Sequence, residues 1–111
     1  MKTRVVAFTG CMALIPLGVI ASGVMPAHGL DINQGRKVYD EKRCALCHAI
    51  GGQGGKVGPD LSNVGSRRDG DWLKRFLRDP KGTVPNAKMP PVKATDEELA
   101  ALVGYLLSLK Q

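Results

Sequence analysis

Cys44-Ala45-Leu46-Cys47-His48 is the stretch of sequence that decides the fold of this 111-residue chain. Two thiols separated by two residues and followed directly by an imidazole form the C-x-x-C-H signature of covalent haem attachment. The spacing has a geometric reason, because both sulfurs can reach the two vinyl groups on one porphyrin edge while His48 turns its ring toward the iron. We therefore expect one haem c per chain, bound through Cys44 and Cys47.

Other uses of the motif fit the sequence less well. A structural zinc site needs four Cys or His ligands, and Cys44, Cys47 and His48 are the only such residues after residue 29. A thioredoxin-like redox pair needs a preceding strand within a βαβ unit, and no strand pattern is found. A disulfide between the two cysteines would close a very small loop and stabilise little. We interpret such a disulfide as a transient state before haem attachment.

The first 29 residues have the pattern of an export signal. Lys2 and Arg4 precede an uncharged stretch over residues 5–25, and Ala27-His28-Gly29 places small residues at the cleavage-determining positions. We place the cleavage after Gly29, which predicts a periplasmic domain of residues 30–111. Because about 20 apolar residues can span a bilayer, the alternative is a retained anchor that holds the domain on the periplasmic face of the inner membrane.

Removal of the signal changes the composition. Without the first 29 residues, 82 of the 111 remain. Loss of Lys2 and Arg4 reduces the basic residues from 16 to 14, and with 10 acidic residues the net charge is about +4. The aromatic residues that remain are Tyr39, Trp72, Phe76 and Tyr105. A single domain of this size with so few large apolar groups is marginal without a staple or a buried cofactor. We expect the haem to complete the core.

A first helix is predicted from Asp31 to about Lys42. Asp31 can cap it with Gln34 reaching back to the cap. Helical spacing then puts Ile32, Gly35 and Tyr39 on one face.

Two more helices follow. The second is expected to begin near Asp71 and to stop before Pro80, and its apolar side consists of Trp72, Leu73, Phe76 and Leu77. The third begins at Thr95, which heads a capping box followed by acidic residues at the positive end of the helix. Its apolar positions are Leu99, Leu102, Val103, Leu106 and Leu109.

The segments between the helices carry loop signals. Residues 51–58 are rich in glycine, and residues 81–92 contain three prolines, so we expect a loop and an extended strap. The predicted fold class is all-α, with three to four helices and long loops around one covalently attached haem.

Beyond the attachment motif, the chain resembles the class I monohaem cytochromes c, the small bacterial electron carriers and the similar haem domains of respiratory complexes. The resemblance covers nearly all of residues 30–111 and implies the small cytochrome c fold. Its features occur in the family's order: Cys44-x-x-Cys47-His48, Gly58-Pro59-Asp60-Leu61, Trp72-Leu73 with Phe76 before Asp79-Pro80, Met89-Pro90, and a last helix with Tyr105-Leu106.

The resemblance implies a set of iron ligands. His48 would be the proximal ligand and Met89 the distal one, and Met89 is the only methionine after residue 29. The carbonyl of Pro59 would accept a hydrogen bond from the second imidazole nitrogen, which orients the ring. The resemblance also pairs Gly35 and Tyr39 with the face of the last helix, where a missing side chain permits close approach.

Three residues are candidates for contacts with the haem propionates. Trp72 either packs in the core of the second helix or offers its N–H to a propionate, and both positions place it against the porphyrin. Arg67 and Arg68 could neutralise propionates, although exposed loop arginines are usually solvated.

An iron bound by both His48 and Met89 has no vacant position for a substrate. We therefore expect a monomeric, non-enzymatic one-electron carrier without nucleic-acid partners. The basic residues Lys42, Arg43, Lys88 and Lys93 flank the motif and the strap, and they should steer redox partners with acidic docking sites, including membrane complexes in transient contact, toward the haem edge.

Two other functions remain open. The domain could be a haem subunit fixed in a respiratory dehydrogenase or oxidase. If Met89 were not a ligand, a five-coordinate haem could act as a peroxidase-like enzyme.

Overall fold

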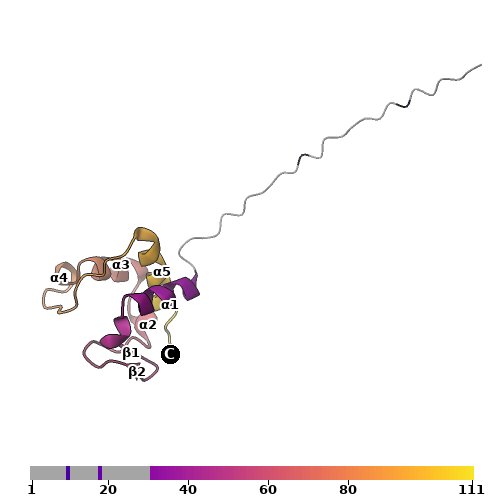
Figure 1. Ribbon diagram of the computed structural model, residues 1–111. Coiled ribbons are helices and arrows are strands. Elements are labelled where there is room, and N and C mark those ends of the chain that lie inside the picture. Colours follow the sequence, from indigo (N-terminus) through magenta and orange to yellow (C-terminus); the bar gives the residue numbers. More distant parts are fainter. Residues whose placement is uncertain (1–9, 11–17, 19–30) are drawn as a thin grey trace, which may run out of the picture.

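The computed structural model describes residues 10, 18 and 31–111 (Figure 1). The predicted export signal and its cleavage site therefore lie outside the described residues, apart from Gly10 and Gly18. Residues 31–111 form the helices α1 (Ile32–Glu41), α2 (Val64–Arg67), α3 (Gly70–Arg78), α4 (Pro80–Thr83) and α5 (Asp96–Leu107), the 3-10 turn η1 (Cys44–Leu46), and the strands β1 (Ala49–Ile50) and β2 (Gln53–Gly54). The helix-rich architecture confirms the predicted fold class. In the part of the chain described here, no helix has both the length and the apolar character needed to span a bilayer.

Helix α5 forms the centre of the core and begins as predicted. Thr95 Oγ1 accepts a hydrogen bond from Glu98 N at 3.1 Å, and the Glu98 carboxylate accepts one from Thr95 N at 3.0 Å. This reciprocal pair satisfies two N–H groups that the first turn leaves without helical partners. Leu99 and Leu102 on its inner face are almost completely buried, and Leu109 is buried although it lies beyond the helix end.

Helix α1 crosses α5 (Figure 1) and starts where the sequence predicts. The Asp31 side chain accepts hydrogen bonds from Asn33 N at 2.9 Å and Gln34 N at 3.3 Å. Its buried residues are Gly35, Val38 and Tyr39. The prediction that Ile32 shares this buried face is wrong, since Ile32 is 48% exposed. It lies in the first turn, ahead of Gly35, where α1 meets α5.

Helix α3 supplies the second wall of the core. It begins at Gly70, one residue earlier than predicted, because Asp69 caps it by accepting a hydrogen bond from Trp72 N at 2.8 Å. Leu73 and Leu77 are buried, as the apolar spacing predicts, whereas Trp72 and Phe76 are partly buried.

The strap after α3 is not wholly extended, which corrects the prediction for residues 81–92. Pro80 starts the short helix α4, because proline is favoured at the first helical position. Asp79 caps this turn by accepting a hydrogen bond from Gly82 N at 3.0 Å. The chain then runs without regular structure to α5, and Val92 N donates to Leu77 O at 2.8 Å, which fixes the strap against α3.

The glycine-rich segment contains a hairpin that was not predicted from the sequence. Strands β1 and β2 pair antiparallel, with Ala49 opposite Gly54 and Ile50 opposite Gln53. Gly51 and Gly52 form the turn with φ angles of +60° and +81°, which favour glycine. Strands of two residues are too short to produce an alternating pattern. The short helix α2 was also not predicted.

Candidate functional site

A cavity of about 480 Å³ lies between η1, α3, α5 and the strap. Leu102 and Leu106 of α5 and Leu73 of α3 form part of its wall, which is almost entirely apolar. Apolar cavities of roughly 300–1,000 Å³ with a few polar groups are typical binding sites for small molecules and cofactors. The cavity is therefore a candidate binding site for a cofactor.

Both thiols of the motif reach this cavity. Cys44 and Cys47 are free, and the tight η1 turn between them is closed by a hydrogen bond from Cys47 N to Cys44 O at 3.1 Å. Cys44 is half-buried and Cys47 is exposed, so one thiol lies inside the cavity and the other at its edge. Burial raises the pKa of the Cys44 thiol, because a thiolate is poorly solvated there.

The His48 ring is held in place by the loop that follows the hairpin. Its Nδ1 lies 2.7 Å from the backbone carbonyl oxygen of Pro59. A Cβ added at Gly58 would lie 2.6 Å from His48 Cε1 and 2.8 Å from Nδ1. Glycine at this position therefore permits the ring to lie close against the loop.

The loop itself is fixed by Asp60. Its Oδ1 accepts a hydrogen bond from Ser62 N at 2.8 Å, and hydrogen bonding to Ser62 lowers the pKa of the carboxyl group. Arg67 Nη2 donates to Asp60 O at 2.9 Å. Arg67 is thus partly engaged by this loop, although it also lines the cavity.

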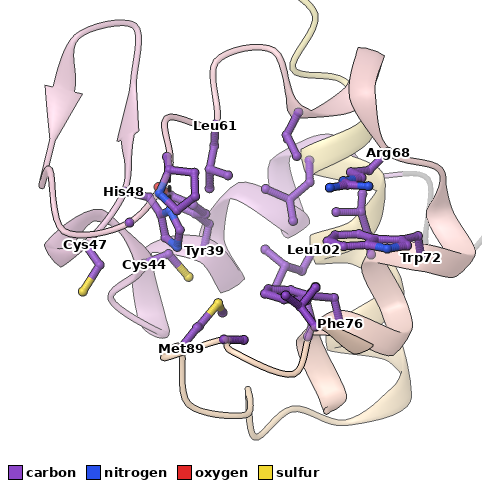
Figure 2. Close-up of a pocket in the computed structure, with 18 of the residues that line it drawn as sticks. Tyr39, Cys44, Cys47, His48, Leu61, Arg68, Trp72, Phe76, Met89 and Leu102 are labelled. Atoms are coloured by element: carbon purple, nitrogen blue, oxygen red, sulfur yellow. Dashed lines mark hydrogen bonds between the residues drawn. The ribbon is translucent and has the colours of Figure 1, made fainter. Parts of the chain in front are cut away.

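Met89 enters the cavity from the strap. Figure 2 shows its side chain reaching into the same space as Cys44 and the His48 ring, although the segments are far apart in the sequence. The side chain is partly buried and packs against the core. The flanking residues Lys88 and Pro90 also line the cavity.

Two aromatic rings line the side of the cavity opposite Cys44 (Figure 2). The rings of Trp72 and Phe76 are stacked, with centroids 4.9 Å apart and planes at 8°. The Arg68 guanidinium carbon lies 4.0 Å from the Trp72 ring centroid, which is a cation–π contact. Trp72, Arg67 and Arg68, the propionate candidates, therefore all lie at the cavity wall.

The cavity thus brings together every site residue predicted from the sequence: Cys44, Cys47, His48, Pro59, Trp72 and Met89. Lys42, which was expected to steer redox partners, is instead engaged in an ion pair, with its Nζ 3.8 Å from Glu98 Oε2. Tyr39 also lines the cavity, and its buried hydroxyl, which was not predicted, has no hydrogen-bond partner within residues 31–111. No local pattern signals a buried polar atom on an otherwise apolar helix face.

The residues present fit a haem attached through its vinyl groups. Two reduced thiols, one imidazole nitrogen free of the Pro59 contact and one thioether converge on an apolar space. Imidazole and thioether are typical axial ligands of haem iron. Stacked aromatic rings provide an apolar surface suited to a flat macrocycle.

Comparison with known proteins agrees with this chemistry. The family model for cytochrome c matches residues 32–110. The chain is 31% identical to cytochrome c2 of Blastochloris viridis, over 81% of this chain and 87% of that protein. It is 37% identical to cytochrome c oxidase subunit 2 of Alkalihalophilus pseudofirmus, over 70% of this chain and 25% of the oxidase protein. It is 33% identical to a nitric oxide reductase subunit of Halomonas halodenitrificans, over 65% of this chain and 54% of the reductase protein.

The chain spans a quarter of the oxidase protein and about half of the reductase protein, but most of the cytochrome c2. The region matched by the family model coincides with the described helices, including the attachment motif and α5. The chain therefore belongs to the cytochrome c family, and its cofactor is a covalently bound haem c.

Proposed function

We propose that this chain is a periplasmic one-electron carrier whose haem c is attached through Cys44 and Cys47 and ligated by His48 and Met89. One observation carries the proposal: an imidazole and a thioether from distant segments line the same apolar cavity as two free thiols. The haem supplies the exchange of one electron. The residues of the chain attach it, orient it and keep water away from it.

Cys44 and Cys47 are both free, and the Cys44 thiol lines the apolar cavity, where burial raises its pKa. Attachment would add the S–H group of each cysteine across a vinyl double bond, so that sulfur bonds to one vinyl carbon and hydrogen to the other. The addition consumes no oxidant, but it requires both cysteines to be reduced.

His48 is prepared as a ligand by its contact with Pro59. A carbonyl oxygen can only accept a hydrogen bond, so the 2.7 Å contact requires the proton to reside on Nδ1. Nε2 then keeps its lone pair for iron. The same hydrogen bond limits ring rotation and raises the basicity of the imidazole.

Replacing Gly58 with alanine tests this arrangement. The new Cβ would lie 2.6 Å from His48 Cε1, so the ring must shift and lose its contact with Pro59. We expect the reduction potential to rise, because a less basic imidazole stabilises ferric iron less. We also expect a loss of about 1 kcal/mol in the free energy of unfolding. Spectroelectrochemical titration and urea unfolding of the holoprotein measure the two effects.

Gly70→Ala is the matched control, because a Cβ there meets its nearest neighbour at 3.4 Å, an ordinary contact. A Gly58→Ala potential equal to that of Gly70→Ala would contradict the roles given to His48 and Pro59.

Met89 completes the coordination in this proposal. Its thioether is a soft ligand, and such a ligand raises the reduction potential by favouring ferrous iron. If His48 and Met89 both ligate the iron, no position would remain for oxygen, peroxide or a substrate. The chain then carries electrons without catalysing a reaction of its own. Both ligands are the same before and after transfer, which keeps reorganisation small.

Replacing Met89 with alanine should leave the haem covalently bound but free one axial position. We expect imidazole and cyanide to bind at least about tenfold more tightly, which corresponds to about 1.4 kcal/mol. Optical titration of the ferric holoprotein gives the affinities. Lys88→Ala, which alters the same strap but keeps the thioether, is the control. Equal affinities in wild type and Met89→Ala would instead favour a five-coordinate haem enzyme.

The surface beside Cys47 is suited to a transient redox partner. Leu46 is 67% exposed and Val57 is 85% exposed, and Cys47 is exposed next to them. Arg43 and Lys88 lie close in sequence to the motif and to Met89, and both are exposed. A partner with an apolar centre and acidic residues around it matches this surface, and the opposite charges would speed association. Lys42 contributes less of this charge, because it pairs with Glu98.

A second candidate function is a haem subunit fixed in a respiratory complex. It is favoured by the similarity to an oxidase subunit and a nitric oxide reductase subunit, each longer than the matched region. Mass spectrometry of the protein from the periplasmic and membrane fractions separates the two. A soluble monomer starting after Gly29 and carrying one covalent haem supports the carrier. A membrane-bound chain starting at Met1 would rule out the diffusible carrier.

A further inference from the structure

Tyr39 carries a hydroxyl group for which the fold has no evident use. The residue is 5% exposed, its hydroxyl oxygen is fully buried, and no group within residues 31–111 forms a hydrogen bond with it. A buried hydroxyl without a partner is unfavourable, because it has lost its hydrogen bonds to water and gained none. Phenylalanine would fill the same space in α1 without this cost. The hydroxyl therefore calls for a hydrogen-bond partner, and attachment of the haem changes the groups beside it.

The position of the Tyr39 ring limits which groups can form a hydrogen bond with its hydroxyl. Tyr39 lines the haem cavity, and its ring meets the edge of Tyr105, with centroids 5.7 Å apart and planes at 65°. This contact and the burial prevent the hydroxyl from swinging into water. Burial raises the pKa of Tyr39 to about 12. Figure 2 shows the Tyr39 side chain on the Cys44 side of the cavity.

The haem propionates do not provide the partner. In the porphyrin, the two propionates leave from the edge opposite the two vinyl groups. A haem attached at Cys44 and Cys47 would therefore direct its propionates away from Tyr39, toward the part of the wall formed by Arg68 and Trp72 (Figure 2). This leaves the thioether sulfur of Cys44, which lies on the same side of the cavity as Tyr39 (Figure 2), as the acceptor for the hydroxyl.

We propose that the Tyr39 hydroxyl donates a hydrogen bond to the Cys44 sulfur once that sulfur is bound to the haem. The inference rests on the proposed attachment through Cys44. A thioether sulfur has lost its hydrogen and can only accept, so it is complementary to an O–H donor. Tyr39 is a positioning residue in this arrangement. The positive end of its O–H dipole faces the haem edge, which disfavours the ferric state and raises the reduction potential.

The test is the reduction potential of the Tyr39→Phe holoprotein. We expect the one-electron equilibrium to shift about threefold toward the ferric state, roughly 30 mV at 59 mV per tenfold change. Tyr105→Phe is the matched control, because Tyr105 belongs to the same aromatic pair but is not among the residues that line the cavity, and its potential should stay at the wild-type value. A Tyr39→Phe potential equal to that of the wild type overturns the proposal.

A double-mutant cycle with Cys44→Ala, which leaves attachment through Cys47 alone, assigns the effect to the sulfur. The Tyr39→Phe shift should disappear in the Cys44→Ala background, and a shift of equal size there overturns the proposal. If Cys44→Ala does not mature, NMR of the reduced wild-type holoprotein replaces the cycle. A slowly exchanging Tyr39 hydroxyl proton close to the Cys44 β-protons supports the bond, and a rapidly exchanging one overturns it. Absence of covalent haem from the wild type would instead refute the proposed function.

Discussion

Replacing both Cys44 and Cys47 with alanine should leave residues 30–111 largely unfolded. The apolar residues of α3, α5 and the strap share one core, and they also form the wall of an open cavity of about 480 Å³. Without haem this almost entirely apolar wall faces water, so its burial no longer stabilises the fold. The free energy of unfolding of a typical domain is only about 5–15 kcal/mol. Without attached haem, the chain cannot retain these walls as they stand.

Far-UV circular dichroism and urea unfolding of the exported double variant measure this effect. We expect low helicity and no cooperative transition. Cys44→Ala alone, which keeps one attachment point, is the comparison that separates loss of the haem from loss of a side chain. A double variant that is helical and unfolds cooperatively would show that the protein core is sufficient by itself.

Replacing Gly35 with alanine should separate the two helices that hold the fold together. A Cβ at this position would overlap the Ala101 carbonyl oxygen and lie 2.5 Å from Tyr105 Cβ. These neighbours are a helix backbone and the first carbon of a side chain, so neither can rotate away. We expect a loss of about 3 kcal/mol, the upper end of the usual range for overpacking. For a domain of this size, that corresponds to a decrease in Tm of roughly 15 °C.

Thermal unfolding of the holoprotein, followed by circular dichroism, gives this value. Gly70→Ala is again the control, because it adds the same methyl group to a helix with room for it. The same Tm in both variants would mean that α1 can shift along α5 at little cost.

The helices with local signals could be predicted from the sequence. Thr95 and Glu98 bond to each other's backbone across one turn, so their spacing alone marks the start of α5. Asp31 marks the start of α1 in the same way, because its carboxylate accepts from two backbone N–H groups in the first turn of the helix. Such contacts join residues three or fewer positions apart, and no tertiary structure is needed to form them.

The errors concern features that depend on what lies nearby in space. Ile32 has the correct helical spacing but lies ahead of the crossing with α5, so spacing alone misplaces it. The turn α4 is an exception, because its signal was local: Asp79 caps it by a hydrogen bond from Gly82 N, and Pro80 begins it. The pairing of Lys42 with Glu98 joins the end of α1 to the start of α5, which no local pattern indicates.

The sequence by itself determined the chemistry of attachment, because Cys44, Cys47 and His48 are close enough along the chain to act on one porphyrin edge. Only the tertiary structure decided that Met89 reaches the same cavity, that the Pro59 carbonyl meets His48 Nδ1, and that the Tyr39 hydroxyl is buried beside Cys44. The physical reason is the separation along the chain of the residues that make each contact. Bonds within a turn are set by local spacing, whereas contacts between distant segments form only when burial of the apolar helix faces brings those segments together.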